Sequence, residues 1–134
     1  MDKTIRDILL KAKRVAVVGF SPKEDRPSYW VAKYLIENGY EVIPVNPNYN
    51  EILGRRCYKG IKDIEGKVDV VDIFRKPEEV PPVVDDAISI GAGAIWMQEG
   101  IINEEAARKA KDAGLDVVMD RCMLKEHRRL LKGG

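Results

Sequence analysis

Five short apolar runs recur along the chain and alternate with segments of helical periodicity. They are rich in Val and Ile and occupy residues 14–19, 40–45, 68–74, 94–97 and 115–119. Continuous runs of this length are typical of strands that are buried on both faces of a parallel sheet. The pattern therefore predicts five strands, each covered above and below by other parts of the chain.

The segments around these runs carry the apolar spacing and the end signals of helices. We predict an N-terminal helix with Ile5, Ile8, Leu9 and Ala12 facing inward, and a second helix that is capped by Ser28 and closed by Asn38 and Gly39. A third helix is expected from near Pro77 to Gly91, and a fourth from the cap Asn103 to Gly114. The last helix is expected after Asp120. The stretch 46–67 lacks such a pattern, so a loop with a short extra strand is expected there.

Strands that alternate with helices define the predicted fold class. Such units imply right-handed crossovers and an α/β, Rossmann-like, doubly wound and mostly parallel five-stranded sheet with helices on both faces. No linker or repeat divides residues 1–134, which predicts a single domain. In this architecture ligands bind beyond the carboxyl ends of the strands, where the strand order reverses. The residues that follow each strand are therefore the candidates for a site.

The loop after the first strand has the composition of a phosphate site. Gly19 allows the backbone to approach a ligand closely, Ser21 offers a hydroxyl group, and Lys23 and Arg26 offer positive charge. The loop is neither the Gly-x-Gly-x-x-Gly sequence of dinucleotide sites nor a P-loop. A tight turn with solvated charges explains these residues equally well on this loop alone.

The second and third strands end in residues that distinguish between nucleotides. An NAD site would carry Asp or Glu after the second strand to bind the ribose hydroxyls, but Asn46 and Pro47 stand there. Phe74 and Arg75 follow the third strand, and an aromatic ring beside a cation suits a phosphorylated ligand that carries a ring. A plain turn and a solvated basic pair are the alternatives.

Polar side chains also follow the fourth strand. Gln98 and Glu99 come directly after an apolar run that contains Trp96. A tryptophan inside a strand is most often a core residue. The two polar residues are candidates for contacts within the crevice at the strand ends.

Five ordered motifs together resemble a known family. They are Val-Gly-Phe-Ser-Pro at 18–22, Ile-Pro-Val-Asn-Pro at 43–47, Val-Asp-Ile-Phe-Arg-Lys-Pro at 71–77, Trp-Met-Gln-Glu-Gly-Ile at 96–101 and Asp-Arg-Cys at 120–122. The chain is similar over nearly its whole length to stand-alone CoA-binding proteins. It also resembles the N-terminal CoA-binding domain of the succinyl-CoA synthetase α subunit and of NDP-forming acyl-CoA synthetases.

The resemblance implies that the protein binds coenzyme A by its nucleotide end. It places Gly19, Phe20 and Ser21 beside the phosphates, Asn46 and Pro47 on the adenosine side, Phe74 and Arg75 across the crevice, and Gln98 near the pantetheine arm. With the residues argued from chemistry, the predicted binding site comprises Gly19, Phe20, Ser21, Pro22, Lys23, Arg26, Asn46, Pro47, Phe74, Arg75 and Gln98.

Composition and charge narrow the remaining possibilities. The 134 residues carry 23 Lys and Arg against 22 Asp and Glu, a formal net charge of +1, whereas nucleic-acid binding calls for a basic excess. Two cysteines, an N-terminus that carries acids and no long apolar run, and only short apolar stretches elsewhere predict a cytoplasmic chain with no membrane partner.

Few residues are candidates for catalysis. The single histidine, His127, lies on an apolar helical stripe and is predicted to be packed in the core. Asp69 and Asp72 are expected to meet polar partners at the ends of their strand. Cys122 follows the fifth strand at a helix start that favours the thiolate, although an inert cysteine is the commoner case. Cys57 lies in the irregular segment and has no such argument.

Three functions remain open from these observations. We expect a non-enzymatic protein that binds CoA or acyl-CoA as a carrier, regulator or partner subunit; its protein partner is unknown. An NAD(P)-linked oxidoreductase on the same fold is the second possibility, and the missing glycines and ribose-binding acid count against it. A ligand-free interaction module is the third.

Overall fold

The computed structural model describes residues 1–133, in which five strands form one parallel sheet. The strands are β1 (Arg14–Val18), β2 (Glu41–Val45), β5 (Val70–Ile73), β6 (Ala94–Met97) and β7 (Asp116–Val118), in the spatial order β2-β1-β5-β6-β7. Every neighbouring pair is parallel. The five predicted strands are confirmed, and the order reverses direction between β1 and β5.

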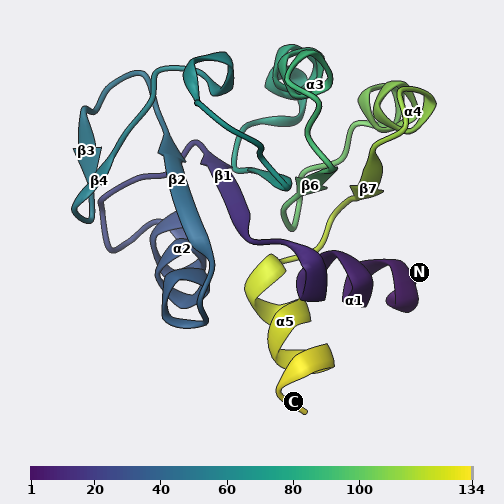
Figure 1. The fold of residues 1–134 in the computed structure, drawn as a ribbon, viewed down its shortest axis with the longest axis horizontal. Helices are drawn as coiled ribbons and strands as arrows, with labels where there is room; N and C mark the ends of the chain where they lie inside the picture. Colours follow the sequence, from purple (N-terminus) through teal and green to yellow (C-terminus); the bar gives the residue numbers. More distant parts are fainter. Residues whose placement is uncertain (134) are drawn as a thin grey trace.

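Helices cover both faces of this sheet (Figure 1). One face carries α1 (Asp2–Lys11), α2 (Pro27–Glu37) and α5 (Met123–Leu131), whereas the other carries α3 (Val80–Ser89) and α4 (Glu104–Asp112). Alternate residues of each strand pack against opposite layers: in β5, Val70 faces the first group and Val71 the second. The doubly wound, Rossmann-like fold predicted from the sequence is confirmed.

The irregular segment 46–67 contains more regular structure than predicted. It forms an antiparallel pair, β3 (Glu51–Ile52) with β4 (Arg55–Arg56), followed by a single 3-10 turn, η1 (Ile61–Asp63). Leu53 and Gly54 connect the two strands with φ values of 50° and 73°. Positive φ at both central residues is the geometry of a type I′ hairpin turn. The hairpin is too short to show a period-two pattern in the sequence.

One of the two predicted helix caps is wrong. Asn103 caps α4 as expected, since its Oδ1 accepts a hydrogen bond of 2.9 Å from the Ala106 amide. Ser28, in contrast, lies inside the first turn of α2, which begins at Pro27. Its hydroxyl oxygen instead accepts a hydrogen bond of 3.0 Å from the amide of Ser21. Proline at the first helical position fixes the start of α2 two residues earlier than a cap at Ser28 would.

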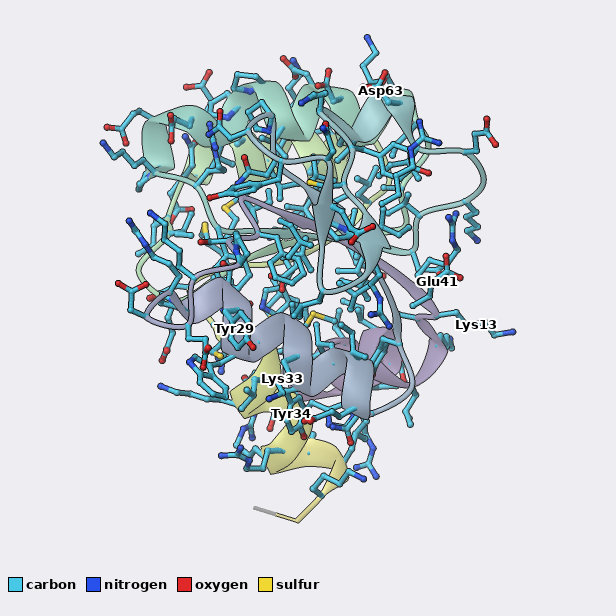
Figure 2. All side chains as sticks on the ribbon, turned by 90° about the vertical axis from the view of Figure 1, so that its left-hand side faces the viewer. Lys13, Tyr29, Lys33, Tyr34, Glu41 and Asp63 are labelled. Atoms are coloured by element: carbon cyan, nitrogen blue, oxygen red, sulfur yellow. The ribbon has the colours of Figure 1, made fainter. Side chains whose placement is uncertain are left out.

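The C-terminal helix α5 is held against α2 by a buried histidine. His127 is 5% exposed, and its Nδ1 lies 2.8 Å from the hydroxyl oxygen of Tyr34. The ring packs edge-on against both Tyr34 and Tyr40. Figure 2 shows Tyr34 on α2 with α5 directly below. Burial lowers the pKa of His127, which keeps the ring neutral; its prediction as a packed core residue is confirmed.

A buried carboxylate fixes the other side of α5. Glu126 pairs with Arg129 at 2.9 Å and with Arg121 at 2.8 Å. Hydrogen bonds from Arg129, and then from Arg121, lower the pKa of Glu126 despite its burial. Arg129 also binds Asp2 in α1 at 3.0 Å, so these pairs join both ends of the chain. These ion pairs help to fix the position of α5 relative to the sheet.

The two aspartates near β5 behave differently from one another. Asp69 accepts hydrogen bonds of 2.9 Å from the amides of Lys13 and Arg14, as expected for a residue at a strand end. Asp72 lies at the centre of the strand, beside Val17 and Trp96, and is fully buried. Within residues 1–133 neither of its carboxylate oxygens has a hydrogen-bond partner. The expectation of polar partners for Asp72 is therefore wrong.

Candidate functional site

A cavity of about 700 Å³ lies at the carboxyl ends of β1 and β5, where the strand order reverses. This is the position at which open α/β sheets bind ligands, and the volume is in the range of small-molecule sites. The loops after all five parallel strands contribute to its lining. Eight residues predicted from the sequence line this cavity: Gly19, Ser21, Lys23, Arg26, Asn46, Phe74, Arg75 and Gln98.

Three predicted site residues lie elsewhere. Phe20 is fully buried beneath the loop, because its ring packs into the core shared with α1, α2 and α5. Pro47 lines a neighbouring cavity of about 440 Å³, which Gly19 and Arg75 also border. Pro22 is half-buried and belongs to neither lining. A motif match places the segment, but it does not say which side of the backbone faces the ligand.

The sequence-based site omitted part of the lining. The additional residues are Pro27, Ser28, Val31, Asn48, Tyr49, Glu99, Ile101 and Cys122. Some signals were present: Asn48 and Tyr49 directly follow Pro47, and Val31 stands three residues after Ser28, on the same face of α2. Glu99 was a candidate for contacts within the crevice, and Cys122 follows the fifth strand at the same sheet edge, so their positions after strands were the signal for both.

Gly19 allows the strand ends to come together at the cavity. Its φ of 85° is in the left-handed region, and its amide donates to the carbonyl of Val45 in β2. On the other side, the Phe74 amide donates to the carbonyl of Val18. A Cβ at Gly19 would overlap the carbonyl oxygen of Phe74. Only glycine permits this approach between the loops after β1 and β5.

The outer end of the cavity is suited to an anion. The N-terminus of α2 opens onto it, and no side chain within the described chain caps this terminus. The Ser28 hydroxyl holds the Ser21 amide, while the Ser21 hydroxyl oxygen accepts a hydrogen bond of 3.2 Å from the Lys23 amide. Lys23 and Arg26 add two exposed positive charges. Helix dipole, free amides and cations together favour phosphate groups.

Asn46 holds two of these loops in place. Its Nδ2 donates a hydrogen bond of 2.9 Å to the carbonyl of Phe20, and its Oδ1 accepts one of 2.9 Å from the Asn48 amide. Both polar atoms of the side chain are thus used within the protein. An acidic residue here would accept hydrogen bonds from the hydroxyl groups of a ribose, whereas Asn46 holds the loop after β1 against the loop after β2.

Arg75 stands between the two cavities and lines both. Its guanidinium lies 3.6 Å from the Glu79 carboxylate, and about a third of its side chain is exposed. An exposed pair of this kind contributes little to stability. The guanidinium is therefore available to a phosphate that enters either cavity.

The inner end of the cavity is formed where the loops after β6 and β7 meet. Gln98 is 4% exposed, and its Oε1 accepts a hydrogen bond of 3.1 Å from the Met123 amide at the start of α5. Asp120, at a φ of 61°, accepts one of 2.7 Å from the Gly100 amide. These contacts fix the two loops against each other, and Cys122 lies between them on the cavity wall.

Two absences bear on other kinds of site. Across residues 1–133 there is no group of three or more His, Cys, Asp or Glu side chains that could hold a metal ion. The same residues contain no helix with the length and apolar character needed to cross a membrane.

The fold defines an α/β protein of the Rossmann-like class, with a cavity at the carboxyl ends of its strands. Residues 13–128 match the sequence model of a family described as the CoA binding domain. The chain belongs to this family.

Comparison with individual proteins gives the same result. The chain is 42% identical over 123 residues to the protein YneT of Bacillus subtilis (strain 168), covering 92% of this chain and 91% of that one. A solved structure of a protein from Pyrococcus horikoshii OT3 superposes with a TM-score of 0.95 at 50% identity, covering 98% and 92% of the two chains.

A third relative is part of a much larger enzyme. The ADP-forming acetate–CoA ligase of Methanocaldococcus jannaschii is 33% identical over 104 residues. These residues cover 75% of this chain but only 15% of the ligase. The likeness therefore concerns one domain of that enzyme.

Proposed function

We propose that the protein binds coenzyme A in the cavity at the strand ends, with the phosphates of the nucleotide over the N-terminus of α2. The observation that carries this proposal is the convergence of an uncapped helix N-terminus with Lys23, Arg26 and Arg75 on one cavity. The lining holds three basic side chains and one carboxylate, that of Glu99, which is paired with Lys125 at 2.9 Å. Such a lining suits a polyanion.

The opposite end of the cavity suits the pantetheine arm. Besides the three cations, the lining presents Val31, Phe74 and Ile101 together with the amide of Gln98. A chain of methylene and amide groups needs apolar contact and a small number of polar partners. The cationic outer end and the amide-bearing inner end therefore match the two ends of coenzyme A in chemistry.

We also propose that the protein serves as a carrier or regulatory binding protein for CoA or acyl-CoA. The groups most suited to acid–base chemistry already have partners within the fold. His127 is packed between Tyr34 and Tyr40, and Glu126 is held by two arginines. This leaves Lys23, Arg26 and Arg75 to bind and orient the ligand. The chain corresponds to the domain of the larger ligase that these comparisons match.

Replacing Arg75 by alanine tests the assignment of the phosphate end. We expect CoA affinity to fall by about 1–3 kcal/mol, the range for losing a charge-assisted hydrogen bond. Isothermal titration with CoA and with dephospho-CoA distinguishes the two phosphate positions. A loss that shrinks for dephospho-CoA assigns Arg75 to the 3′-phosphate, whereas an equal loss assigns it to the pyrophosphate.

Lys76→Ala is the matched control, because it removes a neighbouring exposed cation that does not line the cavity. It should change CoA affinity by about 0.5 kcal/mol or less, as expected for a screened surface charge. Equal effects of the two substitutions, or none from Arg75→Ala, would show that Arg75 does not contact the ligand.

A further inference from the structure

The proposed function gives no role to the thiol of Cys122, which lines the cavity. Both cysteines are free and buried, but their surroundings differ. Cys57 donates a hydrogen bond of 3.5 Å from its Sγ to the carbonyl of Asn46 and does not line this cavity. Burial raises the pKa of the Cys57 thiol. Cys122 lines the cavity at its inner end, so the two thiols form a natural pair for comparison.

An amide donor lies beside Cys122 on the cavity wall. The Met123 amide can bind only an acceptor, which assigns the Gln98 oxygen to that contact and turns the amide nitrogen away from α5. In the described residues this Nε2 donates to no protein group, although Gln98 is 4% exposed and lines the cavity. Of the side-chain atoms that the structure describes, only the Asp72 oxygens are buried without a partner, so this nitrogen is open to the cavity, where a carbonyl oxygen of a ligand can accept from it. The pantetheine arm of CoA carries amide carbonyls near its thiol.

The position of Cys122 is also fixed from the protein side. It is the N-cap residue of α5, a helix of nine residues, and it is 9% exposed. The Trp96 indole nitrogen donates a hydrogen bond of 2.8 Å to the carbonyl of Arg121, which holds the residue before the cysteine.

We infer that Cys122 exchanges with the disulfide form of coenzyme A and becomes linked to one CoA molecule as a mixed disulfide. This inference rests on the proposed function, since it requires the nucleotide end to bind at α2. The Cys122 thiol gives its proton to solvent, and its sulfur attacks one sulfur of the CoA disulfide. The bond between the two CoA sulfurs breaks as the new bond to Cys122 forms. The second CoA leaves as a thiolate and takes up a proton.

The step needs no further oxidant, because the CoA disulfide is the oxidant. The Cys122 thiol is oxidised to the mixed disulfide, and one CoA is released as a thiol. Attack by a free CoA thiol on the mixed disulfide reverses the reaction and restores the Cys122 thiol. The cavity would then hold its ligand covalently under oxidising conditions and exchange it freely under reducing ones. This makes the site responsive to the ratio of CoA disulfide to CoA thiol.

Intact-mass analysis of the full chain after incubation with CoA disulfide tests this inference. Wild type and Cys57→Ser should gain the mass of one CoA, and Cys122→Ser should gain none. Oxidised glutathione is a disulfide without a nucleotide, and the cavity does not position it. Its rate of reaction with wild type should be at most about a tenth of the rate with CoA disulfide. Peptide mapping of the wild-type adduct locates the modified cysteine without any substitution.

Gln98→Ala gives a second readout of the geometry. It should slow adduct formation with CoA disulfide more than the reaction with oxidised glutathione, because loss of the Met123 contact affects both reactions whereas loss of the Nε2 donor affects only the first. Equal rates for the two disulfides, or an adduct mapped to Cys57, would overturn the inference by showing unguided thiol reactivity.

Titration of the same samples with reduced CoA separates the two proposals. If CoA binds and no adduct forms, the inference about Cys122 is wrong and the proposed function stands. If CoA does not bind at all, the proposed function itself is wrong.

Discussion

Replacing Gly19 by alanine should lower the free energy of unfolding by about 2–5 kcal/mol, combining about 1–2 for a left-handed backbone with about 1–3 for overpacking. Gly19 has a φ of 85°, and a Cβ there would overlap the Phe74 carbonyl oxygen. That oxygen belongs to the backbone and cannot rotate away as a side chain does. The loops after β1 and β5 must separate, which also moves Arg75 relative to α2 and should weaken CoA binding.

Gly39→Ala separates the conformational cost from the steric one. Gly39 has a φ of 92°, but within the described chain no atom lies within 4 Å of the position of its Cβ. Alanine there should cost only about 1–2 kcal/mol, the left-handed term alone. Urea unfolding of both variants measures the difference. If Gly19→Ala proves no more destabilising than Gly39→Ala, the close approach at the cavity is not a constraint.

Replacing Asp72 by valine should stabilise the protein by about 1–3 kcal/mol at neutral pH, the range found for unpaired buried polar groups. Asp72 is fully buried in β5 beside Val17 and Trp96, and its carboxylate oxygens have no partner among residues 1–133. Desolvation raises its pKa well above the ordinary value. Valine suits a buried central strand, as its neighbours Val70 and Val71 show.

The pH dependence of this effect has a definite sign. Because the pKa of Asp72 is higher in the folded state than in the unfolded one, the folded state keeps its proton over a range where the unfolded state has lost it. Stability is therefore greatest below the unfolded pKa and declines as the pH rises above about 4. The decline ends only above the folded pKa.

Asp72→Asn isolates the ionisation, since asparagine keeps the polar volume but carries no titrating proton. The stability difference between Asp72→Asn and wild type should grow as the pH rises above about 4, the ordinary carboxyl pKa, until the folded pKa is passed. Urea unfolding at several pH values measures this difference, in which the contributions of Glu126 and His127 cancel. A difference that stays constant with pH would contradict a raised pKa at Asp72.

The sequence was sufficient to predict the layers of the fold, because they depend on signals that persist over many residues. Apolar runs such as 68–74 are long enough to identify a buried strand, and the alternation with helices then determines the topology. A pattern that extends over many residues does not reveal the surroundings of a single side chain. Asp72 interrupts an apolar run and was expected near polar partners, whereas the strand places it between Val17 and Trp96.

The site was less predictable than the fold, because it depends on where individual side chains point. Ser28 has the residue type of a helix cap, yet Pro27 starts the helix first and frees the Ser28 hydroxyl for the Ser21 amide. Phe20 belongs to the loop motif, but its ring enters the core. The position of Cys122 after the fifth strand identified the correct sheet edge, but its place on the cavity wall depends on the packing of α5.

Isothermal titration of the wild-type protein with CoA, NAD and NADP tests the central claim most directly. Asn46 uses both polar atoms of its side chain within the protein, and Lys23, Arg26 and Arg75 surround the cavity. The site therefore lacks the acidic residue that binds the ribose hydroxyl groups of NAD, whereas it contains cations that can bind phosphate groups. We predict saturable binding of CoA at one site per chain and much weaker binding of both dinucleotides. Binding of NAD or NADP as tight as that of CoA, or tighter, would contradict the account.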